Sequence, residues 1–151
     1  MATAPIRVVI ADDHALFREG TRRILDQQPD IVVVGEADGG PRAVETTVLL
    51  KPDVVLIDIR MPGLNGVEAT RQIHERAAET AILILSAFDD DHYVRALLEA
   101  GASGYLLKTV LADDLVEAVR RVHVGETVLH PAIVRKIPQL LAPGLSRSST
   151  K

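Results

Sequence analysis

Short apolar runs recur along the chain, and each is followed by a segment with helical periodicity. Ile6–Ala11 is almost wholly apolar and rich in β-branched residues, as expected for a parallel strand that helices cover on both faces. Residues 14–27 then alternate apolar and charged positions at helical spacing, and Asp12 or Asp13 is available to cap the start of that helix. The pattern predicts a buried strand followed by an amphipathic helix.

The same alternation continues through four further units. Five strand-helix units in succession predict an α/β fold with a doubly wound, five-stranded parallel sheet and right-handed crossovers. The helix ends agree, because Lys51-Pro52 should end the second helix and Gly101 stands where a C-cap glycine belongs. The other strands are expected at residues 31–37, 54–58, 82–86 and 104–107, and the other helices at 43–50, 67–77, 90–100 and 112–122.

The pattern changes after about residue 125. Residues 131–141 begin like a helix with proline at its first position, but Pro138 interrupts them, and residues 146–151 have the composition of a linker. We therefore expect one domain over residues 1–125 and a linker or helical tail over residues 126–151.

Composition excludes several classes of protein. The net charge of -4 argues against a surface that binds nucleic acid unaided. The absence of cysteine excludes disulfides and thiolate metal sites. The N-terminus lacks a secretion signal, and no apolar stretch approaches the ~20 residues that span a bilayer. We expect a cytoplasmic protein without membrane contact.

Polar side chains stand where four of the predicted strands end. Asp12 and Asp13 follow the first strand, Asp58 closes the third, Ser86 closes the fourth and Lys108 follows the fifth. The carboxyl ends of parallel strands lie along one edge of a sheet, so these groups should converge. Three carboxylates, a hydroxyl and an ammonium together would suit a divalent cation and a phosphoryl group.

Each of these residues also has a simpler interpretation. Asp12 and Asp13 could only cap a helix, Lys108 could lie on the surface, and Ser86 could be a strand-end hydroxyl. Asp58 favours the interpretation as a cation site. An ionised carboxylate at the end of a buried strand and close to other carboxylates is energetically unfavourable without a cation. Mg²⁺, which prefers hard oxygen ligands, fits this set best.

Four motifs then carry a resemblance to a known family. The motifs are Ile10-Ala11-Asp12-Asp13-His14, Asp58-Ile59-Arg60-Met61-Pro62-Gly63, Ser86-Ala87 and Tyr105-Leu106-Leu107-Lys108. With them the chain resembles a response regulator receiver domain, the phospho-acceptor module of two-component signalling, over about residues 6–124. The stretches at residues 11–20, 34–37 and 101–108 further resemble the NarL/FixJ (LuxR-type) subgroup.

The resemblance implies a flavodoxin-like (CheY-like) strand order of 2-1-3-4-5 and a Mg²⁺-dependent phosphoryl acceptor. Asp58 would be the phosphorylated nucleophile, and Asp12 and Asp13 would hold Mg²⁺ with help from Asp58 and the backbone carbonyl of Arg60. Lys108 would pair with the phosphoryl group.

The resemblance also implies a switch and partners. Ser86 and Tyr105 would form the conformational switch. A sensor histidine kinase would supply the phosphoryl group, phosphorylation would drive homodimerisation, and DNA would be bound only through a C-terminal helix-turn-helix domain. Because this chain stops at Lys151, we expect a fragment of a longer regulator or a single-domain receiver.

Two rival functions stay open at this point. An aspartate-nucleophile phosphohydrolase would normally have a second aspartate two residues after the nucleophile, where this chain has Arg60. A pseudo-receiver would act as a constitutive interaction module rather than as an enzyme or phospho-acceptor. If Asp58 is phosphorylated, Arg60 and Phe88 are expected to modulate how water reaches the phosphorus.

Overall fold

The computed structural model describes residues 4–87, 93–131 and 133–135. The predicted start of the fourth helix at Asp90, the predicted role of Phe88 and the expected linker from residue 136 lie outside these residues. The described elements are β1 (Ile6–Ala11), α1 (Ala15–Asp26), β2 (Ile31–Ala37), α2 (Gly40–Leu50), β3 (Val54–Asp58), α3 (Gly66–Arg76), β4 (Ala81–Ser86), α4 (Val94–Ala100), β5 (Gly104–Leu107), α5 (Ala112–His123) and β6 (Val128–Leu129).

All strand pairs are parallel, in the order β2-β1-β3-β4-β5-β6. The doubly wound fold and the 2-1-3-4-5 order are thus confirmed, but the prediction of five strands is wrong. The sixth strand pairs with β5, with Gly104 opposite Val128 and Tyr105 opposite Leu129. Two residues are too few to show a periodic pattern, so β6 is recognisable only from its pairing.

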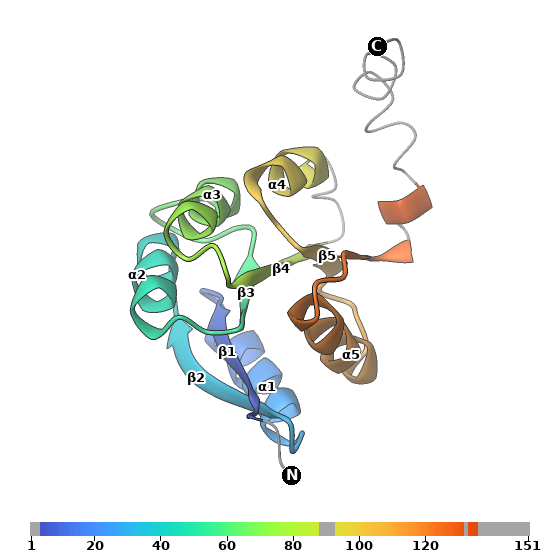
Figure 1. Cartoon of the computed structure of the whole chain (residues 1–151). Helices are drawn as coiled ribbons and strands as arrows, with labels where there is room; N and C mark the ends of the chain where they lie inside the picture. The colour runs from blue at the N-terminus through green and yellow to red at the C-terminus, as the bar shows by residue number, and fades with distance from the viewer. Residues whose placement is uncertain (1–3, 88–92, 132, 136–151) are drawn as a thin grey trace.

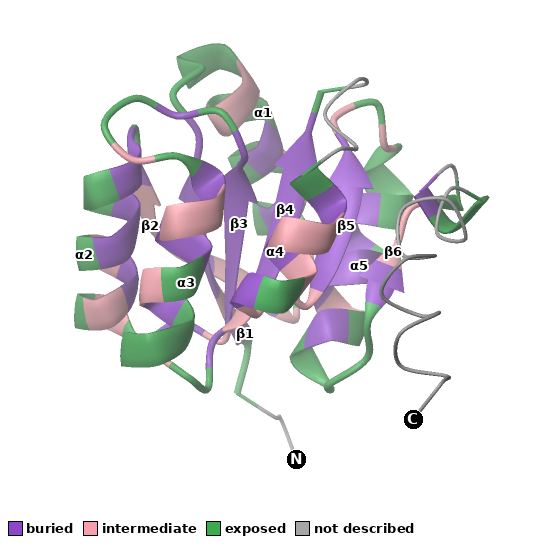
Figure 2. Cartoon of the chain, turned by 90° about the horizontal axis from the view of Figure 1, so that it is seen from above, coloured by how far each residue is buried: buried purple, intermediate pink, exposed green. Residues whose placement is uncertain are grey.

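Helices cover both faces of the sheet (Figure 1). The helices α2, α3 and α4 pack side by side over one face, and α1 and α5 lie over the other. The strands between them are almost entirely buried (Figure 2). Alternate residues of each strand join two separate apolar clusters, one with α2, α3 and α4 and one with α1 and α5, as a strand period of two requires.

Helix ends follow local backbone chemistry. α2 ends before Lys51, which has a left-handed φ of 49° and precedes a proline, and α4 ends at Gly101, with a φ of 115°. One prediction is wrong, because the N-cap of α1 is His14 rather than Asp12 or Asp13. The Asp12 carboxylate instead accepts a hydrogen bond from the His14 backbone N–H within the turn that precedes the helix.

Backbone hydrogen bonds join the segment after α5 to the sheet. The backbone N–H of Val128 donates to Ser103, and that of His130 donates to Tyr105. Ile133, beyond β6, is 2% exposed and belongs to the core beside α4. Among the described residues, no helix has the length and apolar character that crossing a bilayer requires.

Gly104, the first residue of β5, leaves no room for a side chain between β4 and β6. A methyl group there would lie 2.7 Å from Leu83 Cδ1 and 2.9 Å from the Val128 carbonyl oxygen. We expect Gly104→Ala to lower the free energy of unfolding by about 1–3 kcal/mol, because buried neighbours must shift. The measurement is chemical denaturation of the whole chain.

Gly20→Ala is the matched control. Gly20 lies inside α1, and nothing lies within 4 Å of the added methyl group. Alanine should therefore stabilise the helix, by up to about 1 kcal/mol. Equal effects of the two substitutions would contradict the close packing of β6 against β5.

Candidate functional site

The strand order brings the predicted site residues to one edge of the sheet. Asp12 directly follows β1, Asp58 is the last residue of β3, Ser86 is the last residue of β4, and Lys108 directly follows β5. Because β1, β3, β4 and β5 are consecutive in the sheet, their carboxyl ends form a continuous row. The apolar runs thus place charged side chains where the buried strands end.

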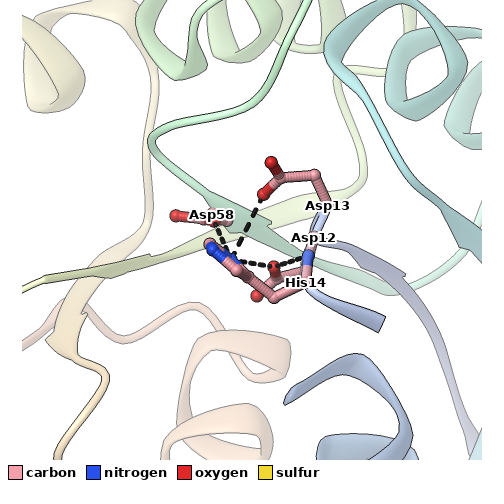
Figure 3. A group of neighbouring side chains, drawn as sticks. All are labelled: Asp12, Asp13, His14 and Asp58. Carbon is pink, nitrogen blue, oxygen red and sulfur yellow. Dashed lines mark hydrogen bonds and ion pairs between the residues drawn. The ribbon is translucent and has the colours of Figure 1, made fainter. Parts of the chain in front are cut away.

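The carboxylates of Asp12, Asp13 and Asp58 form a compact cluster together with His14 (Figure 3). One ligand atom from each of these four residues lies within 4.8 Å of every other. Asp12 is 2% exposed and Asp58 3%, whereas Asp13 faces solvent. Two of the three negative charges are therefore held away from water.

One ammonium group partly balances these charges. Lys108 Nζ donates to Asp58 Oδ2 at 2.9 Å and lies 3.2 Å from Asp12 Oδ2. The same Nζ lies 4.7 Å from the centroid of the Phe17 ring on α1, a cation-π distance. Lys108 is therefore held between two carboxylates and an aromatic face, and is not a freely moving surface lysine.

Burial sets the direction of the pKa shift of Asp58 but not that of Lys108. Burial raises the pKa of Asp58, and the nearby charge of Asp12 adds to the rise, although hydrogen bonds from Lys108 and the Arg60 backbone oppose it. Burial alone would lower the pKa of Lys108, but Asp58 and Asp12 outweigh it and raise that pKa. An ion pair would ordinarily lower the pKa of its carboxylate. The rise for Asp58 means that one ammonium does not offset the burial of this crowded carboxylate.

Asp12 Oδ2 provides a test of whether a cation fits. This atom is buried and has no hydrogen bond; Lys108 Nζ is within ion-pair distance, at 3.2 Å, but not in hydrogen-bond geometry. A buried carboxylate oxygen without a hydrogen bond is costly. Three neighbouring carboxylates, one with such an oxygen, match the hard oxygen ligands that Mg²⁺ prefers.

Arg60, predicted to offer its backbone carbonyl, follows closely after β3. Its backbone N–H donates to Asp58 Oδ1 at 3.2 Å. This contact holds one carboxylate oxygen of Asp58, while the other faces Lys108. The loop therefore fixes the orientation of the Asp58 side chain.

Ser86 and Tyr105 lie toward the other face of the sheet. Tyr105 is fully buried and belongs to the apolar cluster that includes Val94 and Leu97 of α4. Ser86 follows Ile84 of the same cluster by two residues, and its hydroxyl donates to the Ala87 carbonyl at 3.1 Å. The hydroxyl thus donates to the backbone carbonyl of the next residue rather than to Asp58, and the tyrosine ring is directed inward.

A hydrogen-bond network next to the carboxylates was not predicted from the sequence. Arg18 of α1 donates to the Asp12 backbone carbonyl and, at 2.9 Å, to Glu36 of β2. Burial alone would raise the pKa of Glu36, but hydrogen bonds from Arg22 and Arg18 outweigh it and lower that pKa. The four-residue spacing that puts Arg18 and Arg22 on one face of α1 was the only sign of this network in the sequence. Their common partner, Glu36, is distant in the sequence and could not be identified from it.

Comparison with known proteins gives the family. Residues 8–120 match the model of the response regulator receiver domain. The chain belongs to this family. Transcriptional regulatory protein DegU of Brevibacillus brevis is 48% identical over 132 residues, which are 87% of this chain and 56% of that protein. LiaR of Bacillus subtilis (strain 168) is 42% identical over 132 residues, which are 87% of this chain and 63% of LiaR.

Solved structures agree with this family. The signal receiver domain of a NarL response regulator from Mycobacterium tuberculosis has a TM-score of 0.79 at 40% identity, covering 82% of this chain and all of that one. A LuxR-family response regulator from Aurantimonas sp. SI85-9A1 has a TM-score of 0.84 at 33% identity, covering 90% and 97% of the two chains. The chain is a receiver domain of the NarL/LuxR type. It spans about 60% of the DegU and LiaR sequences.

The raised pKa of Asp58 predicts how its charge affects stability. A carboxyl whose pKa is higher folded than unfolded contributes stability below its unfolded pKa, near 3.8, and that contribution is lost as pH rises through the folded value. The ionised group thus destabilises the fold at pH 7. Without divalent cations, we expect Asp58→Asn to raise the melting temperature by roughly 4 °C, the effect of about 1 kcal/mol in a small domain.

Asp38→Asn serves as the control for this measurement. Asp38 is an exposed carboxylate in the loop after β2, so its removal should leave the melting temperature nearly unchanged. Thermal unfolding of both variants at pH 7 in chelator makes the comparison. A fall in the melting temperature of Asp58→Asn would mean that its pairing with Lys108 outweighs its burial.

Proposed function

We propose that this receiver accepts a phosphoryl group on Asp58 from a partner sensor histidine kinase and thereby controls a transcriptional output. The observation that carries the proposal is the Asp58 carboxylate, 3% exposed, with Lys108 Nζ at 2.9 Å and two further carboxylates beside it. This arrangement offers one nucleophilic oxygen together with the charges that phosphoryl transfer needs.

The acidic cluster would hold Mg²⁺. Asp12, Asp13 and Asp58 would be its protein ligands, with the backbone carbonyl of Arg60 as a further one. When bound, the ion would neutralise charge on the carboxylates and on the transferred phosphoryl oxygens. The buried Asp12 oxygen that lacks a hydrogen bond supports this assignment.

The residues of this chain then perform the transfer. An oxygen of ionised Asp58 attacks phosphorus in line, an O–P bond forms, and the P–N bond to the kinase histidine breaks as that imidazole takes up a proton. Lys108, whose pKa is raised chiefly by Asp58 and Asp12 against the effect of burial, remains cationic and pairs with the transferred oxygens. The product is an acyl phosphate that water later hydrolyses.

Ser86 and Tyr105 would couple this event to the surface. Phosphorylation adds close to two negative charges and strong acceptor oxygens. Ser86 can exchange its bond to the Ala87 carbonyl for one to a phosphoryl oxygen. The buried Tyr105 ring packs with α4 residues, so a rearranged β4–α4 segment would change the packing around it.

The output would be transcriptional and would act through homodimerisation. DegU and LiaR are transcriptional regulatory proteins and are longer than this chain. DNA would be bound by a C-terminal domain rather than by this acidic receiver, whose net charge is -4. We place the protein in the cytoplasm, where a sensor kinase could reach it.

The test is intact mass after incubation with acetyl phosphate, with and without Mg²⁺. We expect the wild type to gain one phosphoryl group only with Mg²⁺, and Asp58→Asn to gain none. Lys108→Ala should react about 100-fold more slowly, since it loses a cation that stabilises the transferred oxygens. Asp38→Asn, which changes an exposed aspartate, should match the wild type.

The same experiment separates the proposal from its rivals. Phosphorylation of Asp58→Asn to the same extent would place the acceptor elsewhere. A wild type that never gains mass under any condition would instead indicate a pseudo-receiver.

A further inference from the structure

The sheet continues beyond the residues that match the receiver family. The family match ends at residue 120, whereas β6 begins at Val128 and pairs in parallel with β5 (Figure 2). Backbone hydrogen bonds extend this pairing. The N–H of Val128 donates to the Ser103 carbonyl at 3.2 Å, and that of His130 donates to the Tyr105 carbonyl at 2.9 Å. β5, which carries Tyr105, is therefore an inner strand and not the edge of the sheet.

Tyr105 is enclosed from both sides within the sheet. Ile84 of β4 pairs with it on one side, and Leu129 of β6 pairs with it on the other. Paired residues of neighbouring strands point to the same face of a sheet. Leu129 accordingly packs against the apolar cluster that contains Tyr105 and Ile84. Without β6, β5 would be an edge strand, and this flank of the tyrosine would be uncovered.

Ile133 completes the enclosure. It is 2% exposed and belongs to the same cluster as Tyr105 and as Leu97 of α4. Its backbone N–H donates to the His130 carbonyl at 2.8 Å, so a turn follows β6. The next residue, Val134, is 48% exposed. Burial at this end of the described chain is therefore specific to the Ile133 side chain.

We propose that β6, His130 and Ile133, together called the C-terminal strap, hold the Tyr105 ring inward and transmit rearrangements of that ring to the chain that follows. The inference rests on the proposed function, because it assigns to the strap the step from the Tyr105 switch to the output. Ile133 is a positioning residue in this scheme, since it acts on the site only through Tyr105 and α4.

One packing arrangement gives the strap this role. Ile133 fits one position of Tyr105 and α4, because a close-packed interior tolerates few alternatives. If phosphorylation of Asp58 rearranges the β4–α4 segment, Ile133 loses contacts and the strap detaches more readily. By linkage, detachment of the strap favours the rearranged state to the same extent. The chain continues from the strap into residues 136–151, so detachment changes how the following residues are anchored.

Tyrosine fluorescence tests whether the strap holds the ring. The chain has two tyrosines, Tyr93 and Tyr105, and no tryptophan, so emission from a Tyr93→Phe background reports Tyr105 alone. Because the Tyr105 ring is fully buried, we expect acrylamide to quench this emission weakly. In the same background, Ile133→Ala should raise the quenching toward that of free tyrosine, because it removes a side chain that encloses the ring.

Val134→Ala is the matched control. It truncates the exposed neighbour of Ile133 and should leave the quenching of Tyr105 unchanged. Ile133→Val keeps most of the buried side chain and should give an intermediate rise, so the test does not depend on the stability of the alanine variant. Circular dichroism of each variant shows that its helices and sheet are intact.

Hydrogen exchange tests the transmission. With acetyl phosphate and Mg²⁺, the wild-type peptide that carries the amides of Val128 and His130 should exchange at least about fivefold faster, the lower end of typical allosteric coupling. The same peptide in Asp58→Asn should not respond. Intact mass records which samples are phosphorylated.

Unchanged quenching in both Ile133 variants would overturn the proposal. So would a phosphorylated wild type whose strap exchanges as slowly as before, and either result would leave the phospho-acceptor role intact. A wild type that gains no phosphoryl group would contradict the proposed function. The quenching measurement, which needs no phosphodonor, would still decide whether the strap holds Tyr105.

Discussion

The buried carboxylates of Asp12 and Asp58 impose the main constraint on this molecule. Both lie at the carboxyl ends of apolar strands and are nearly inaccessible to water, yet they lie close enough for one ammonium, Lys108, to contact both. Burial and mutual repulsion raise the cost of ionising Asp58, and a single Lys108 cannot neutralise three carboxylates. The fold therefore maintains an excess of negative charge that a bound cation would offset.

Side chains alternate between the two faces of the sheet along each strand, so the site residues are divided between these faces. Asp12, Asp58 and Lys108 continue the alternation of residues that pack toward α1 and α5, and Lys108 contacts Phe17 of α1. Ser86 and Tyr105 continue the opposite alternation, toward α4. Asp58 therefore lies on the face that α1 and α5 cover, whereas Ser86 on β4 and Tyr105 on β5 lie on the face that α4 covers.

Much of the fold could be predicted because strong apolar runs encode buried parallel strands. The runs at β1, β3 and β4 are long and β-branched, and their order along the chain implied the convergence of Asp12, Asp58 and Lys108 at one edge. The two residues of β6 could not be predicted, because only their pairing with Gly104 and Tyr105 defines them.

Details that depend on three-dimensional contact were also missed. Capping propensity favoured Asp12 or Asp13 at the start of α1, but the turn placed His14 there and directed its ring toward the carboxylates. The bond from Arg18 to the Asp12 carbonyl depends on the packing of α1 and on the position of Glu36 in β2. Local sequence does not contain that information.

The most direct test of the central claim is Mg²⁺ binding itself, measured by calorimetry at pH 7 with the wild type and Asp12→Asn. If the buried carboxylates form a cation site, the wild type binds one Mg²⁺ and Asp12→Asn binds it at least about 10-fold more weakly. Equal affinity in the two proteins, or no binding to the wild type, would contradict the claim that the crowded carboxylates exist to hold a cation.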